Sequence, residues 1–137
     1  MFDQTAFING AIAFLIAFGI ACLFLVAFQL VYQVTTPQEE RRLIREGNVA
    51  AAITFGGAII GFALPVASAL SQTVGMVEFA AWATLAGIVQ IVAALIIRAL
   101  VIKDVHVRIE RGEVATGVYL AAVAIAIGLI NAASMTY

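Results

Sequence analysis

Residues 39–46 have the sequence EERRLIRE, a short charged stretch between two long segments without Asp, Glu, Lys or Arg. A second charged stretch, residues 98–113, separates two further uncharged segments. The four uncharged segments are residues 4–38, 47–77, 79–97 and 114–137. Each reaches or nearly reaches the roughly 20 residues that a helix needs to cross a bilayer. The charge pattern therefore predicts four membrane spans joined by two charged connectors.

The composition supports lipid as the surrounding medium. The chain is 64% hydrophobic and 11% charged, whereas soluble domains carry about 25% charged residues. Backbone polar groups in lipid must be satisfied within their own segment, so the spans are expected to be helices. We predict an all-α membrane protein with spans at about 7–34, 49–70, 77–101 and 114–137, and connectors at 35–48 and 102–113.

The basic residues predict the orientation. All seven Lys and Arg side chains fall in or beside the connectors, and short loops rich in Lys and Arg stay on the cytoplasmic side. Both termini are therefore expected outside, and the first span is expected to be retained in the mature protein. The basic residues are candidates for docking a cytoplasmic partner or for contacting lipid: Arg41, Arg42, Arg45, Arg98, Lys103, Arg108 and Arg111. Arg98, at the inner end of a span, is expected to reach out to the headgroups.

The two halves of the chain resemble each other. Gly47-Asn48-Val49-Ala50 recurs as Gly112-Glu113-Val114-Ala115, and each motif lies between a charged connector and a span rich in small residues. We predict two units, residues 1–72 and 73–137, each with two spans. Units with two spans share one orientation, so the repeat is expected to be parallel.

The connectors contain their own helix signals. Thr36, Pro37 and Glu39 fit the N-cap, first position and third position of a short helix that ends at Gly47. In the second connector, the acidic and basic residues suit a helix. The alternation of Val105, Val107 and Ile109 suits an extended segment equally well, and the sequence leaves this open.

Small residues mark two spans as packing faces. Gly57 and Gly61 form a GxxxG pair, and such a pair lets two helix backbones approach closely. The fourth span has matching steps, Gly117 to Ala121 and Gly128 to Ala132. We expect these faces to pack the second and fourth spans of one chain together, with a homodimer interface as the alternative.

Polar residues within the spans form one predicted cluster: Pro65, Ser68, Gln90, Asn131 and Glu78. Pro65 removes a helical donor and leaves a carbonyl one turn earlier unpaired. Polar side chains in lipid need partners, so hydrogen bonding between helices is the expected role. The alternative is a small binding site, with Glu78 as an interfacial cation or proton site.

The run from Asn48 to Ala69, NVAAAITFGGAIIGFALPVASA, and the ending Asn131–Tyr137, NAASMTY, resemble the domain of unknown function 350 family of YjfL-like proteins. The resemblance covers nearly the whole chain. It implies a bacterial inner-membrane protein without an assigned activity. The family's association with phage-shock-like proteins and polyamine-linked enzymes implies a role in envelope homeostasis.

The residue inventory argues against an enzyme. The one cysteine, Cys22, lies mid-span, and the one histidine, His106, lies in a connector, so no Cys–His nucleophile forms. No metal site, cofactor or nucleic-acid contact is expected. We favour a non-enzymatic scaffold in the lipid bilayer that forms homo-oligomers and docks a cytoplasmic peripheral protein. The alternative is a small oligomeric channel or carrier for a small cation or polyamine.

Overall fold

The computed structural model describes residues 1–36 and 39–135, and this part of the chain is folded into six helices. They are α1 (Gln4–Thr35), α2 (Glu40–Arg45), α3 (Val49–Gln72), α4 (Met76–Leu100), α5 (Val105–Glu110) and α6 (Val114–Ala133). The four longer helices are long and apolar enough to cross a membrane. The prediction of an all-α protein with four candidate spans is confirmed. The last two residues assigned to the fourth span, 136 and 137, lie outside the described residues.

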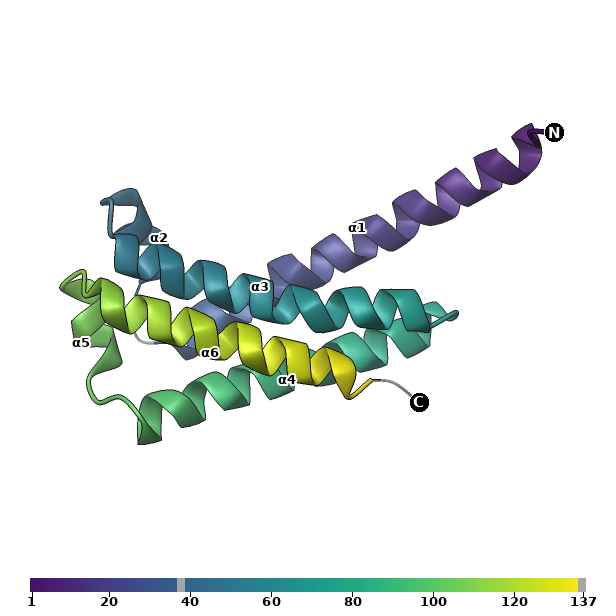
Figure 1. Cartoon of the computed structure of the whole chain (residues 1–137). Helices are drawn as coiled ribbons and strands as arrows, with labels where there is room; N and C mark the ends of the chain where they lie inside the picture. The colour runs from purple at the N-terminus through teal and green to yellow at the C-terminus, as the bar shows by residue number, and fades with distance from the viewer. Residues whose placement is uncertain (37–38, 136–137) are drawn as a thin grey trace.

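The long helices are not equivalent in their packing. Helices α3 and α6 lie side by side along their length, and α4 packs against both (Figure 1). Helix α1 joins α3 and α4 only through its second half, where its buried residues Phe28 and Tyr32 lie. Its N-terminal half diverges from the bundle (Figure 1). All four spans therefore meet only toward the end of the bundle that carries α2 and α5.

Aromatic side chains hold α1 in place. The Phe28 ring stacks on the Phe62 ring of α3 with centroids 4.4 Å apart. Phe24 meets Phe79 of α4 edge-on at 5.5 Å. Such pairs contribute about 1 kcal/mol each beyond the area that they bury. These rings fix the position of Tyr32, one turn beyond Phe28.

Glycines allow α3 and α6 to touch backbone to backbone. A Cβ atom on Gly57 would overlap Ala121, and one on Gly128 would overlap the carbonyl of Gly61. A Cβ on Gly117 would lie 2.7 Å from the carbonyl oxygen of Ala50. The small-residue faces are thus occupied within one chain, which is the intramolecular arrangement expected for them.

The two short helices α2 and α5 lie at the same end of the bundle (Figure 1). Each is followed by a glycine in the left-handed region, Gly47 at φ 84° and Gly112 at φ 79°, where a side chain would be strained. Gly47 N–H donates to the carbonyl of Ile44 at 3.0 Å, and Gly112 N–H to that of Ile109 at 2.9 Å. Each connector therefore ends in the same kind of turn before the next span begins.

The start of α2 differs from the predicted capping box. The helix begins at Glu40, with Glu39 at its N-cap and no side-chain capping bond, while Pro37 lies outside the described residues. The Thr36 hydroxyl lies 2.9 Å from the Tyr32 carbonyl oxygen, so it closes the end of α1 instead. The last carbonyl groups of a helix have no partner within the helix, and this explains why Thr36 donates to the end of α1 instead of capping α2.

The second connector is helical. Val105 and Ile109, one turn apart on α5, are buried against the bundle, whereas Val107 is exposed. An extended segment would point all three side chains to one side. The sequence left open whether this connector is helical or extended, and the burial of Val105 and Ile109 at helical spacing favours the helix.

Candidate functional site

Two amide side chains connect α4 and α6 in the bundle interior. Asn131 Nδ2 donates to the Ala86 carbonyl oxygen at 3.1 Å and approaches Gln90 Oε1 at 3.4 Å. Gln90, 4% exposed, donates from Nε2 to the Ala124 carbonyl oxygen at 3.3 Å. Each amide thus takes part in hydrogen bonding between helices, the role expected of polar groups in lipid.

The other members of the predicted cluster lie apart from this pair. The Ser68 hydroxyl donates to the Ala132 carbonyl oxygen at 3.1 Å and accepts from Gln72 Nε2 at 3.2 Å. Pro65 is fully buried in α3. Glu78 is exposed in the first turn of α4, about 18 Å along the helix from Gln90 at 1.5 Å per residue. The structure therefore divides the five residues among separate contacts instead of gathering them in one site.

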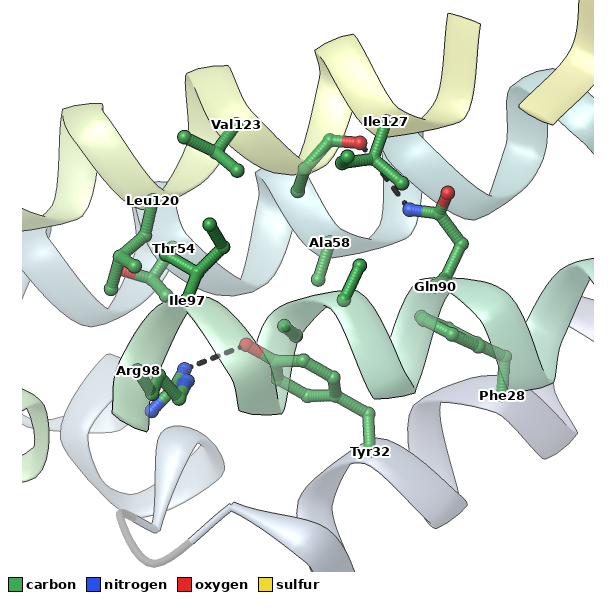
Figure 2. Close-up of a pocket in the computed structure, with 13 residues that line it drawn as sticks. Phe28, Tyr32, Thr54, Ala58, Gln90, Ile97, Arg98, Leu120, Val123 and Ile127 are labelled. Atoms are coloured by element: carbon green, nitrogen blue, oxygen red, sulfur yellow. Dashed lines mark hydrogen bonds between the residues drawn. The ribbon is translucent and has the colours of Figure 1, made fainter. Parts of the chain in front are cut away.

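A small cavity lies beside Gln90, between the four long helices, and Figure 2 shows the residues that line it. Its volume is about 30 Å³, and α1, α3, α4 and α6 all contribute to its wall. Most of the lining is aliphatic or aromatic. The polar side chains in the wall are those of Tyr32, Thr54, Gln90 and Arg98. The cavity therefore offers both space and hydrogen-bonding groups among the long helices.

Arg98 faces the bundle at the end of this cavity that lies toward the connectors. Its Nη2 donates to Tyr32 Oη at 2.8 Å, and its guanidinium carbon lies 5.9 Å from the centre of the Tyr32 ring (Figure 2). Arg98 was expected at the lipid headgroups, whereas its guanidinium group contacts Tyr32 of another span, α1. Tyr32 was not among the predicted site residues, because α1 and α4 pairing is not visible in the sequence.

Glu40 is a buried acid just outside the cavity. It is 1% exposed, and this burial raises the pKa of its carboxyl group. Hydrogen bonds from its own backbone N–H and from Thr36, together with the positive charge of Arg98, lower the pKa and offset part of the effect. Its Oε1 lies 2.9 Å from the Thr36 hydroxyl, while within residues 1–36 and 39–135 nothing donates to its Oε2. The Thr36 hydroxyl has one proton, so it can donate either to the Tyr32 carbonyl or to Glu40 Oε1, but not to both. When Glu40 is protonated, its own O–H can donate to the Thr36 oxygen, and both contacts are then hydrogen bonds. The sequence offered no signal to separate buried Glu40 from its exposed neighbour Glu39.

The two connectors are joined at the same end of the bundle. Asn48 caps α3 by accepting from the Ala51 N–H at 2.9 Å, and its Nδ2 donates to the Ile109 carbonyl oxygen at 2.7 Å. Leu43 of α2 belongs to the same buried apolar cluster as Val105 and Ile109 of α5. We call α2, α5 and Asn48 together the connector platform. It is one packed surface instead of two independent loops.

Ion pairs within each connector neutralise part of the positive charge of the connector platform. Arg42 pairs with Glu39 at 2.8 Å and with Glu46 at 3.3 Å. Arg108 pairs with Glu113 at 2.9 Å. The pKa of Glu113 lies below its ordinary value, mainly because the Thr116 hydroxyl donates to its carboxylate and also because of the nearby Arg108. Arg111 also lies 3.9 Å from Glu113. Three further basic residues are exposed near the platform: Arg41, Arg45 and Lys103.

Within the described residues, no three His, Cys, Asp or Glu side chains gather in a group that could hold a metal ion. Cys22 is partly buried in α1, and His106 is exposed on α5. The polar groups that line the cavity are amide, hydroxyl and guanidinium groups.

Comparisons with known proteins find a family and two relatives that are named as inner-membrane proteins. The profile of the family described as Domain of Unknown Function (DUF350) matches residues 6–135. The chain is 29% identical over 130 residues to the UPF0719 inner membrane protein YjfL of Escherichia coli K12, covering 95% of this chain and 98% of that protein. The protein of the same name in Escherichia coli O157:H7 matches equally. No solved structure matches.

Proposed function

The chain belongs to the DUF350 family and is an inner-membrane protein with four candidate spans, and from that premise we propose that it is a non-enzymatic scaffold. In this proposal the connector platform faces the cytoplasm and docks a peripheral protein that serves envelope homeostasis. The observation that carries the proposal is the link between the connectors, in which Asn48 of one connector bonds to Ile109 of the other at 2.7 Å.

A rigid surface favours docking because less conformational freedom is lost on binding. The Asn48 amide and the apolar cluster of Leu43, Val105 and Ile109 hold α2 and α5 in one arrangement. Loops that only connected two spans would not need a shared core. The platform is thus prepared for a partner of complementary shape.

The charges of the platform indicate the kind of partner. Arg42 and Arg108 are paired with acids of their own connector, while Arg41 and Arg45 are exposed one turn apart on α2. Neighbouring exposed arginines suit bidentate contacts with carboxylates. We therefore propose that the docking partner presents an acidic surface.

The concentration of Lys and Arg at this end of the bundle supports the cytoplasmic side for the platform and an outer location for both termini. The parallel repeat is part of the same proposal. It is supported by the matching turns at Gly47 and Gly112, which are 65 positions apart in the chain and precede α3 and α6 in the same way. Two parallel units place both connectors at one end, as a shared platform requires.

Homo-oligomers are also proposed. The small-residue faces of α3 and α6 are used within the chain, so self-association would use another surface. The diverging half of α1 is exposed and has Gly10 and Gly19 with open space around them. We place the contact between copies there.

Co-purification from native membranes tests the docking proposal. The double variant Arg41→Glu with Arg45→Glu should lose a soluble partner that the wild-type chain retains after mild cross-linking. The matched control, Asp3→Lys with Glu78→Lys, changes charge by the same amount at the other end of the bundle and should retain it. Co-purification that survives reversal of the arginines would remove the proposal, and so would reporter fusions that place residues 42 and 108 on opposite sides.

The cavity supports a second candidate function, a small oligomeric channel or carrier. A few polar side chains of its mostly apolar wall lie inside the membrane-spanning bundle, where polar groups often mark pathways. The charge of Arg98 opposes a cation or polyamine in this space, so that substrate class is disfavoured for a path through the cavity. Flux measured in proteoliposomes, with Gln90→Leu as the test variant, distinguishes this candidate from the scaffold.

A further inference from the structure

Helix α1 is too long to cross a bilayer upright. Its 32 residues extend over about 48 Å at 1.5 Å per residue, whereas the hydrocarbon core is about 30 Å thick. A span of such length is accommodated by tilting. Helix α6, with 20 residues, needs no comparable tilt. The divergence of the N-terminal half of α1 from the bundle is therefore the geometry expected of spans with such different lengths (Figure 1).

An apolar crevice lies between α1 and α4. Its walls come from residues 24–31 of α1 and 83–91 of α4, together with Phe62 of α3, and its volume is about 200 Å³. Residues 83–91 and Phe62 lie around the middle of α4 and α3. The crevice is therefore at the depth of the hydrocarbon core, where lipid headgroups do not reach.

The chemistry of the wall favours hydrocarbon as the occupant. Among the described residues that line the crevice, Thr84 alone has a polar side chain, and its hydroxyl donates to the Ala80 carbonyl oxygen at 2.7 Å. The stacked rings of Phe28 and Phe62 form part of the wall, and a Cβ atom on Gly87 would lie 3.2 Å from the Phe62 ring. A bound water needs two to four polar partners, and this wall does not offer them.

The crevice is open to lipid and suits part of one acyl chain. Ala27 on the α1 wall and Thr84 on the α4 wall are exposed. A volume of about 200 Å³ is roughly seven times the ~30 Å³ that a water molecule takes in the liquid, and a methylene group takes a similar volume. About six or seven methylene groups therefore fit. An empty crevice would forfeit their dispersion contacts with both helices.

We propose that one acyl chain of a membrane phospholipid occupies this crevice and acts as a wedge that keeps α1 apart from α4. The site goes beyond the proposed docking role, because no residue of the connector platform lines the crevice. It is also separate from the proposed contact between copies, since Gly10 and Gly19 are not part of its wall. Failure of either earlier proposal would leave this one standing.

Photolabelling of the full-length chain in phosphatidylcholine vesicles tests the site. The probe is a phosphatidylcholine with a diazirine in the middle of one acyl chain, and labelled residues are located by mass spectrometry. Labelling of residues 24–31 and 83–91 should saturate at a low fraction of probe. Labelling of the exposed face of α6, which contacts exchanging lipid, should rise in proportion to the probe. Proportional labelling at both places would show only surrounding lipid and would overturn the proposal.

Two variants assign the saturable labelling to the crevice. Thr84→Phe fills it from α4 and Ala27→Phe fills it from α1, and both positions are exposed, so both variants should fold. Each should lose the saturable labelling. Ala126→Phe, on an exposed face of α6 away from the crevice, is the matched control and should keep it. Saturable labelling that survives in both crevice variants would overturn the proposal, because the chain would then bind elsewhere.

A second copy of the chain is the competing occupant. With Cys22→Ser as the background, Thr84→Cys gives a single thiol on the crevice wall. The proposal expects no disulfide between copies at this position. Such a disulfide together with the absence of saturable labelling would place a partner helix in the crevice and would overturn the proposal.

The distance between α1 and α4 tests the wedge itself. Spin labels at Ile12→Cys and Val77→Cys, both exposed, are placed in the Cys22→Ser background and measured in short-chain and long-chain phosphatidylcholine. A thicker hydrocarbon core requires less tilt, so the distance should shorten in the long-chain lipid. Thr84→Phe should shorten less, because its ring stays in the crevice. A fixed distance in the wild type, or equal shortening in the wild type and Thr84→Phe, would overturn the wedge.

Discussion

The carbonyl oxygen of Gly61 in α3 lies directly against Gly128 in α6, with no room for a side chain between them. Pro65 explains why this carbonyl is available, because proline has no N–H to donate to the residue four positions earlier. The backbone contact with α6 gives the oxygen a weakly polarised Cα–H as a neighbour instead. Pro65 in α3 and Gly128 in α6 thus act together at this close contact between the two helices.

Gly128→Ala should destabilise the protein by about 2 kcal/mol, because the added methyl group overlaps the Gly61 carbonyl and forces α3 and α6 apart. The measurement is the free energy of unfolding in mixed micelles. Gly56→Ala is the matched control, since Gly56 has no neighbour within 4 Å of an added Cβ. It should be neutral or slightly stabilising, and an equal loss in both variants would contradict the close contact.

Glu40→Gln should stabilise the protein at neutral pH by about 1 kcal/mol, since it removes the cost of a buried carboxylate with an oxygen to which no described residue donates. Burial raises the pKa of Glu40 in the folded state above its ordinary value of 4.5. The folded chain therefore holds this proton more tightly, and wild-type stability falls as the pH rises from 4.5 through the folded pKa.

Unfolding measured as a function of pH checks this prediction. The wild-type curve should decline with rising pH, and the Glu40→Gln curve should be flatter. Glu46→Gln, a change of an exposed carboxylate at the end of the same helix, should leave the decline in place. A Glu40→Gln variant that keeps the full decline would assign it to another group.

Substitutions of Asn48 can separate its two roles. Asn48→Asp keeps an oxygen that accepts from Ala51 N–H but loses the amide donated to Ile109, whereas Asn48→Ala loses both. Each contact contributes about 1 kcal/mol. Asn48→Asp should therefore leave α3 intact while α5 exchanges its amide hydrogens faster. Hydrogen exchange read by mass spectrometry checks this, and unchanged protection of α5 would mean that the apolar cluster alone holds the platform.

Asn131→Leu should reduce stability without changing the fold, because it removes the bonds to Ala86 and Gln90. A double-mutant cycle with Gln90→Leu isolates the contact between the two side chains. Their coupling should be about 0.6 kcal/mol, the average for such bonds in membrane proteins. A flux that disappears in Asn131→Leu at unchanged stability would favour the channel or carrier instead.

The interior polar groups show how far sequence reasoning reached. Asn131 and Gln90 could be singled out from the sequence because amides in an apolar span need partners. Tyr32 and Arg98 look like ordinary interfacial residues, since each lies near the end of its own span. Their contact depends on how α1 lies against α4, and nothing in either segment alone specifies that packing. The cavity that they line was missed for the same reason.

The sequence alone determined that the chain has four membrane-length helices and where the charged connectors interrupt them. Hydrocarbon permits only segments whose backbone bonds are internal and whose charges are few, so this information is local in the chain. Only the tertiary structure decided that α1 diverges, that Arg98 turns inward to Tyr32, that Glu40 is buried and that Asn48 joins the connectors. Lipid is as apolar as the helix surfaces, so hydrophobicity does not choose partners among helices; close packing and a few hydrogen bonds do.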